Sequence, residues 1–431
     1  MVTLNRYKII FLWTRNILVL KGFSIYFIAG SLNKAIPFLL LPIITRYLSP
    51  TEFGIWAIYQ VLISFIIPFI GLNSPINITR NFFKVECSEI AEIIGNLMIM
   101  VSALMTLTLL ALSLLFLFID SFLGIPQSWI YVLPVIGFVS MINQYNLVVL
   151  RNRECPKTYG GFEIGRTAIN FGIAVYLIVV LEQGWESMVW GVLIANMIFS
   201  VLSVLNLKKN GYLIWNYNSK RITEILHISL PLLPHALSGM IISLSDRLFI
   251  DSMLGKSYVG LYAVAYTFGA IVYLFTESFN KAWSPWMYRQ LADISPEKKV
   301  KIIKLTYLYY LAIVLLALLI TALSYFLINT LFDVNYQTSK NYVLWIAVGM
   351  AIQGMYFMVF PYLVHIGKTQ FIGLFTGLAA LTNLLGNYIL INANGVVGAA
   401  QSTAISYMVM FIGVWWYSNR VYPMPWFTLK T

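Results

Sequence analysis

A small set of ionisable side chains interrupts the long apolar stretches of this sequence, and their chemistry suits transport. A charged group inside a membrane is costly and is kept mainly where it faces a partner or a wet cavity. Buried Lys and Arg can bind phosphate oxygens, and buried carboxylates can take up protons or small cations. The expected anion-binding residues are Lys34, Arg166, Arg247 and Lys281, and the expected cavity or coupling residues are Asp246, His235, Glu163 and Glu277.

Three of the basic residues have an acidic residue one helical turn away, which favours local ion pairs. Side chains three or four positions apart share a helix face, and paired charges are cheaper to bury. Extension of the basic side chain to the membrane surface explains these three residues equally well. The expected pairs are Glu163 with Arg166, Glu277 with Lys281, and Asp251 with Arg247.

Lys34 and Asp246 have no such local partner. Lys34 lies about eleven residues, or roughly 17 Å along a helix, from either end of its apolar stretch, so it cannot reach the membrane surface. We therefore expect it to contact an anionic ligand near mid-membrane. His235 precedes Asp246 on nearly the same helix face, and we expect both to line one cavity. A structural role for His235 remains an alternative.

The elements that must position these residues are membrane-spanning helices. Hydrophobic residues make up 60% of the 431-residue chain and charged residues 10%, with a mean hydropathy of +0.80, which excludes an ordinary soluble protein. Apolar runs of about 20 residues can each cross the bilayer, so we predict an all-α polytopic bundle of about twelve transmembrane helices. The expected spans are 22–45, 53–73, 95–119, 129–150, 160–181, 187–207, 226–250, 258–283, 304–331, 341–365, 370–391 and 396–419.

The distribution of positive charge predicts the orientation of the chain. Lys and Arg concentrate in alternate loops, so by the positive-inside rule both termini are cytoplasmic. The net charge of +12 reflects this bias and does not indicate a nucleic-acid partner. The long cytoplasmic loops 208–221 and 285–304 combine aromatic and basic residues, which is typical of segments that touch membrane lipids.

An internal repeat predicts two lobes. The segment YLSPTEFGIWAI (47–58) aligns without gaps with MLGKSYVGLYAV (253–264), and the two copies follow the first and seventh expected spans. Such a pattern indicates parallel six-helix repeats, a plan found in secondary transporters. The expected domains are an N-terminal lobe (1–207), a cytoplasmic linker (208–224) and a C-terminal lobe (225–431).

Amide side chains add polar surface inside the spans. Asn143, Gln144 and Asn146 are expected to line a cavity, with interhelical hydrogen bonds as the alternative. For Asn383 and Asn387, which are four positions apart, interhelical hydrogen bonding is the favoured interpretation.

The sequence contains no motif for familiar enzyme chemistry. It has no GxxxxGK[ST], HExxH or GxSxG segment, and its histidines are scattered. Cys87 and Cys155 fall in expected cytoplasmic loops and suggest neither a disulfide framework nor a metal site. We therefore predict no catalytic residues, no cofactor and no metal, and a protein that is not an enzyme.

Three segments carry a resemblance to a known family: RYLSPTEFGIWAIYQ (46–60), the run from LPLLPHALSG to AVAYTFG (230–269), and NGVVGAAQSTAISYMVMF (394–411). They resemble the bacterial flippases for polysaccharide units, including O-antigen and capsule units, of the multidrug/oligosaccharidyl-lipid/polysaccharide exporter superfamily. The residues that match its motifs are Ser245, Asp246 and Arg247 in Ser-Asp-Arg, and Gly260 and Tyr262 in Gly-Leu-Tyr.

The resemblance implies a flippase of the bacterial inner membrane with two lobes around a central cationic cavity. It would move an undecaprenyl-pyrophosphate-linked oligosaccharide from the cytoplasmic to the outer leaflet by alternating access. A polysaccharide polymerase and a chain-length regulator would be its protein partners. One alternative is a cation-coupled multidrug exporter of the same superfamily. A membrane-embedded polysaccharide polymerase is disfavoured because the expected outer loops are short.

Overall fold

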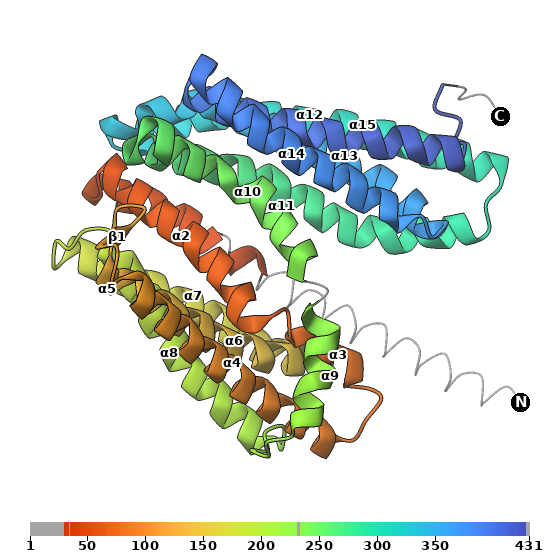
Figure 1. Ribbon diagram of the computed structural model, residues 1–431. Coiled ribbons are helices and arrows are strands. Elements are labelled where there is room, and N and C mark those ends of the chain that lie inside the picture. The colour runs from red at the N-terminus through yellow and green to blue at the C-terminus, as the bar shows by residue number, and fades with distance from the viewer. Residues whose placement is uncertain (1–29, 34, 231–232, 428–431) are drawn as a thin grey trace, which may run out of the picture. The chain divides into compact units, whose positions relative to one another are not determined.

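The computed structural model describes residues 30–33, 35–230 and 233–427, which are almost entirely helical (Figure 1). The described residues include ten helices long and apolar enough to cross a membrane. The reason for this architecture is physical, because a helix in hydrocarbon satisfies its own backbone hydrogen bonds. The expected all-α polytopic fold is confirmed.

Two of the twelve expected spans are not among these ten helices. Within the span 22–45, residues 22–29 and 34 lie outside the described residues, and the described remainder, 30–33 and 35–45, is helical. Over the span 226–250, the chain forms the end of α9 (Ser219–Ser229) and most of α10 (Leu233–Leu254). The second of these carries Asp246, Arg247 and Asp251, which lower its hydropathy.

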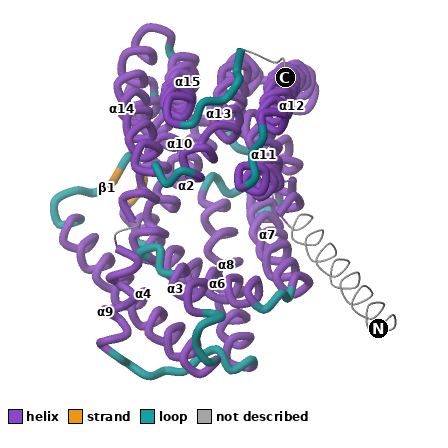
Figure 2. The backbone as a smooth tube through the Cα atoms, turned by 90° about the vertical axis from the view of Figure 1, so that its right-hand side faces the viewer, coloured by secondary structure: helices purple, strands orange, loops and turns teal. Residues whose placement is uncertain are grey.

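The chain forms two compact units, the first comprising residues 1–47 and 62–237. Its long helices pack side by side, α7 against α8, α8 against α6, and α6 against α4 (Figure 2). An apolar core of isoleucine, leucine, methionine and valine side chains holds α4 and α6 together. The elements here, besides α9, are α3 (Pro75–Asn81), α4 (Cys87–Leu115), β1 (Ser121–Phe122), β2 (Ile125–Pro126), α5 (Gln127–Ile130), α6 (Val132–Asn152), α7 (Pro156–Val179) and α8 (Glu186–Lys209).

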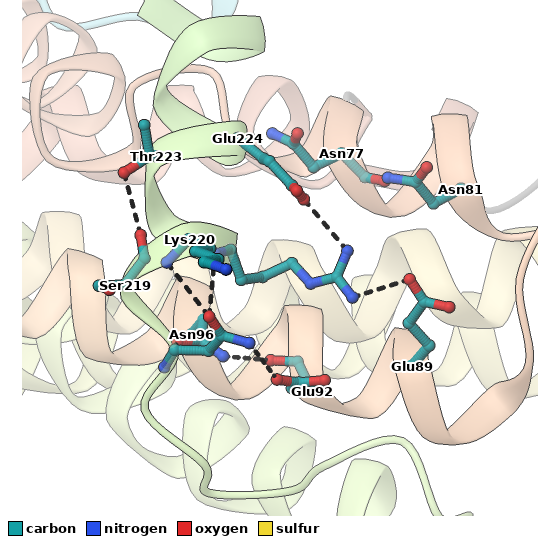
Figure 3. Close-up of polar contacts among 11 residues, drawn as sticks. Asn77, Asn81, Glu89, Glu92, Asn96, Ser219, Lys220, Thr223 and Glu224 are labelled. Atoms are coloured by element: carbon teal, nitrogen blue, oxygen red, sulfur yellow. Dashed lines mark hydrogen bonds and ion pairs between the residues drawn. The ribbon is translucent and has the colours of Figure 1, made fainter.

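The segment expected to be a linker, 208–224, is bound to α4 within the first unit. Asn218 caps α9 by accepting hydrogen bonds from the backbone N–H groups of Lys220 and Arg221. The guanidinium of Arg221 then pairs with Glu89 of α4 at 2.7 Å and with Glu224 of α9 at 3.2 Å, as the dashed lines in Figure 3 show. These contacts attach the end of the segment 208–224 to α4.

The second unit comprises residues 48–61 and 238–431. Here α15 packs against both α13 and α14, and α13 packs against α11. The first half of α2 (Pro50–Gly71) belongs to this unit and its second half to the first unit. The remaining elements are α10, α11 (Lys256–Ala292), α12 (Pro296–Leu331), η2 (Val334–Ser339), α13 (Lys340–His365), α14 (Thr369–Asn394) and α15 (Val396–Val421).

The two copies of the sequence repeat meet inside the second unit. Gly54 and Gly260 hold equivalent positions in the repeat, as do Pro50 and Lys256. A Cβ on Gly54 would collide with the carbonyl oxygen of Lys256, and a Cβ on Gly260 would collide with that of Pro50. The contact between α2 and α11 is therefore reciprocal, and only glycine allows the backbones to approach so closely.

The prediction of a loop at 285–304 is wrong, because most of this segment is helical. Helix α11 continues to Ala292, and α12 begins at Pro296 after only a short turn. Ser295 caps α12 by accepting a hydrogen bond from the backbone N–H of Lys298. Both helices therefore extend well past the apolar stretches from which the span ends were predicted.

Candidate functional site

A cavity of about 700 Å³ opens within the first unit, between α6, α7 and α8, with residues of α2 and α3 completing its wall. Apolar residues such as Ile63 and Ile136 line part of it, and a band of polar and charged side chains lines the rest. A cavity of this size, with convergent polar groups, is the usual form of a ligand site.

Helix α7 supplies most of the polar band. Tyr159, Glu163, Arg166, Thr167 and Asn170 all line the cavity. Their spacing of four, three, one and three residues places them on one face of an α-helix. At 1.5 Å per residue, this stripe extends over about 16 Å. A short turn with Pro156 at the first helical position starts α7, so the stripe begins next to the end of α6.

Helix α6 faces this stripe with Ser140, Gln144 and Arg151, which are also lining residues. Gln144 is exposed, whereas the other residues from 141 to 150 are buried. Asn143 and Asn146 point elsewhere: Asn143 donates to Asn196 of α8, and Asn146 accepts from Asn206 of α8. Of the three amides expected to line a cavity on this helix, only Gln144 does so.

The charges of the cavity are partly balanced. Arg166 pairs with Glu163 at 3.3 Å, as its i,i+3 spacing predicted. Asn33 also donates to the Glu163 carboxylate at 2.6 Å. Among the described lining residues, Arg151 and Arg166 carry positive charge and Glu163 carries negative charge. The cavity is therefore net cationic and suited to an anionic group.

A second polar cluster lies in the second unit, around Asp246 of α10. The Asp246 carboxylate is 1% exposed and accepts hydrogen bonds from Tyr262 of α11 and Thr403 of α15, both at 2.6 Å. Asn387 of α14 donates to it at 2.9 Å, and Asn383 lies at 3.5 Å. The expected interhelical hydrogen bonds of Asn383 and Asn387 are confirmed.

This cluster is closed but not fully satisfied. Ser245 donates to the side-chain oxygen of Asn383 at 2.7 Å, which adds a further residue of α10 to the network. The side-chain oxygen of Asn387 is buried and accepts no hydrogen bond within the described part of the chain. The amide group that carries this oxygen donates its N–H to the Asp246 carboxylate.

Two expectations for α10 are corrected. Asp251 pairs with Lys256 at 3.1 Å, and not with Arg247 as its spacing suggested. Gly255, with φ of 99°, turns the chain between α10 and α11 and places Lys256 beside Asp251. Arg247 does not extend to a surface, because it is only 9% exposed and its guanidinium lies over the ring of Tyr266 at 4.6 Å.

The remaining expected residues lie apart from both sites or outside the described structure. Lys281 pairs with Glu277 at 3.0 Å as its spacing predicted, but its side chain is 67% exposed. Lys34 and the side chain of His235 lie outside the described residues. The structure therefore places Glu163 and Arg166 together in one cavity, and Asp246 and Arg247 in a different unit.

Sequence reasoning missed Arg151, Tyr159 and Asn170. From the sequence, Arg151 is one of the loop charges that predict the orientation of the chain. The available signal was the spacing: Ser140, Gln144 and Arg151 repeat along one face of α6 as the polar residues do along α7.

Comparisons with known proteins agree with this architecture. A model of the family described as "Polysaccharide biosynthesis protein" matches residues 19–291. The "Capsular polysaccharide biosynthesis protein CapF" of Staphylococcus aureus is 22% identical over 94% of this chain and 100% of that protein. The "Lsg locus putative protein 1" of Haemophilus influenzae is 23% identical over 82% of this chain and 86% of that protein.

Solved transporter structures share the fold. The lipid II flippase MurJ in an inward closed conformation gives a TM-score of 0.69 at 12% identity, over 93% of this chain and 86% of that chain. A multidrug resistance transporter of the MATE family and MOP superfamily, in an inward-facing conformation, gives a TM-score of 0.66 at 15% identity. The match covers 92% of this chain and 94% of that chain. The resemblance drawn from the sequence motifs is confirmed.

Proposed function

We propose that this chain, which belongs to the polysaccharide biosynthesis protein family, is a flippase for lipid-linked oligosaccharides. Its substrate would be an oligosaccharide unit attached through pyrophosphate to undecaprenol, moved from the cytoplasmic to the outer leaflet of the bacterial inner membrane. The observation that carries the proposal is the net cationic cavity of the first unit, where Arg151 and Arg166 accompany a stripe of uncharged polar groups.

The chemistry of such a substrate fits this cavity. A pyrophosphate is anionic and cannot cross hydrocarbon without charge compensation, which guanidinium groups provide through charge-assisted hydrogen bonds. The sugars need a wet polar path, and the polyprenyl tail can stay in the lipid. Lys34, expected near mid-membrane, would add a further positive charge to the path taken by the pyrophosphate.

The remainder of the proposal follows the expected topology. Two six-helix lobes (1–207 and 225–431) would expose the site to each side of the membrane in turn. Both termini would be cytoplasmic. A polysaccharide polymerase and a chain-length regulator would receive the translocated unit on the outer side. The Asp246 cluster would couple transport to H⁺ or Na⁺, because a buried carboxylate lies there beside a buried amide oxygen. Glu277 and His235 are secondary candidates for coupling and Arg247 for anion contact, whereas the exposed side chain of Lys281 is expected to contribute little.

Reconstitution tests the flippase directly. Purified protein is placed in proteoliposomes with a fluorescent polyprenyl-pyrophosphate disaccharide, and outward movement is followed by susceptibility to an added glycosidase. The wild type is expected to translocate the probe, and the double variant R151Q/R166Q to lose about tenfold or more in rate, since two charge-assisted contacts are removed. Wild-type vesicles no faster than empty ones would contradict the proposal.

A cation-coupled multidrug exporter is the second candidate, and the buried Asp246 carboxylate is the observation that favours it. The fold is shared with solved transporter structures, and that the chain is not an enzyme stays a prediction. Efflux of a cationic dye from the same vesicles, driven by an ion gradient and without movement of the lipid-linked probe, would favour the exporter.

A further inference from the structure

The polar stripe of the first-unit cavity contains uncharged side chains that form no hydrogen bonds with other described residues. Gln144 of α6 and Thr167 and Asn170 of α7 line the cavity, and their side chains make no hydrogen bond to any described residue. Neighbouring polar groups are committed: Ser140 donates to the side-chain oxygen of Asn196 at 3.4 Å. The unused groups are therefore available to a ligand.

These groups lie close to Arg166 along the helices. Asn170 is one turn beyond Arg166 on the same face of α7, about 6 Å along the axis. Gln144 lies seven residues before Arg151 on α6, about 10 Å along its axis, and α6 and α7 run antiparallel through a short turn. Gln144 and Asn170 therefore line one cavity from two different helices.

The position of Asn170 depends on a close approach to α8. A Cβ on Gly191 would collide with the backbone carbonyl oxygen of Asn170 and would also crowd its side-chain oxygen. Glycine at this position leaves room for the Asn170 amide at the cavity wall.

We infer that Gln144 and Asn170 bind an uncharged sugar residue of the lipid-linked saccharide, next to the pyrophosphate held by Arg166. This inference rests on the proposed function and narrows its substrate class. An amide both donates and accepts hydrogen bonds, as do sugar hydroxyl and acetamido groups. An acidic sugar at this position would lie near the Glu163 carboxylate, which repels it, and would compete with the pyrophosphate for Arg166.

The test measures binding of three probes to the purified protein in nanodiscs: polyprenyl pyrophosphate alone, the same lipid with a neutral disaccharide, and the same lipid with a uronic acid as its first sugar. Q144M and N170L are each expected to raise the Kd of the neutral-disaccharide lipid about three- to tenfold, the effect of one lost hydrogen bond. The Kd of the bare pyrophosphate lipid should not change. Wild-type protein should bind the uronic-acid lipid more weakly than the neutral one.

Controls separate recognition from folding. Gln183 is exposed in the turn after α7 and does not line the cavity, so Q183M should alter no Kd. If N170L does not fold, Q144M and T167V carry the test, since both side chains line the cavity without a partner among the described residues.

The outcomes distinguish two failures. Wild-type binding of the neutral-disaccharide lipid, with Q144M and N170L silent or equally damaging to the bare pyrophosphate lipid, overturns this inference and leaves the flippase standing. Equal or tighter binding of the uronic-acid lipid also overturns it. Wild-type failure to bind any of the three lipids overturns the proposed function together with the inference.

Discussion

The two polar sites differ in how much of their hydrogen-bonding capacity the protein itself uses. In the first unit, Glu163 and Arg166 border a cavity of about 700 Å³, and Gln144 and Asn170 have no side-chain partner among the described residues. In the second unit, Asp246 is 1% exposed and accepts three short hydrogen bonds. The first site borders a cavity of ligand size, whereas the second is a buried network in which the protein's own side chains occupy the carboxylate.

The sequence alone gives one list of charged residues. The structure divides them between an open cavity and a buried hydrogen-bond network. An open site with unused donors binds a ligand at little cost to stability, because few protein contacts must be broken. A closed network holds helices together, and its loss leaves buried donors without acceptors. Substitutions should therefore affect binding in the first unit and stability in the second.

The largest effect on stability is expected at Asp246. D246A leaves the donors Tyr262, Thr403 and Asn387 without an acceptor and should lower the free energy of unfolding by about 2–3 kcal/mol. Thermal unfolding in detergent measures this loss. D246N keeps the volume, so it should unfold between the wild type and D246A. A D246A protein as stable as the wild type would remove the contrast between the two sites.

A smaller effect, on binding and not on stability, is expected at Glu163. E163Q removes the only described negative charge lining the cavity and frees Arg166, so binding of polyprenyl pyrophosphate should tighten about threefold. Titration in nanodiscs measures the Kd, and the midpoint of unfolding should change little. The matched control is E277Q in the second unit, which should leave the Kd unchanged. Weaker binding by E163Q would mean that Glu163 positions Arg166 rather than competing for it.

The smallest effect is expected at Lys281. Its side chain is 67% exposed and its ion pair with Glu277 is local, so K281A should change stability by less than about 0.5 kcal/mol. Transport of the lipid-linked probe should be near the wild-type rate. A strong transport defect at normal stability would show that Lys281 contacts substrate, as the sequence suggested.

Local features of the fold and of the sites could be predicted from the sequence. The ion pairs Glu163–Arg166 and Glu277–Lys281 follow from spacing within one helix. The pairing of Asp251 with Lys256 did not, because a glycine with positive φ interrupts the helix between them and the helical rule no longer applies.

Contacts between distant segments could not be predicted. The partners of Asp246 come from α11, α14 and α15, and no spacing rule connects α10 with those helices. The same holds for the cavity, where the polar faces of α6 and α7 could be recognised from the sequence but their convergence required the packing of both helices with α8.

Photolabelling tests the central claim most directly. A polyprenyl-pyrophosphate disaccharide with a diazirine on its first sugar is bound to the wild-type protein in nanodiscs, irradiated, and the labelled residues are identified by mass spectrometry. The account predicts label on α6 and α7, between residues 140 and 170, and loss of that label with excess unlabelled substrate. Competable label confined to α10, α14 and α15 would contradict it.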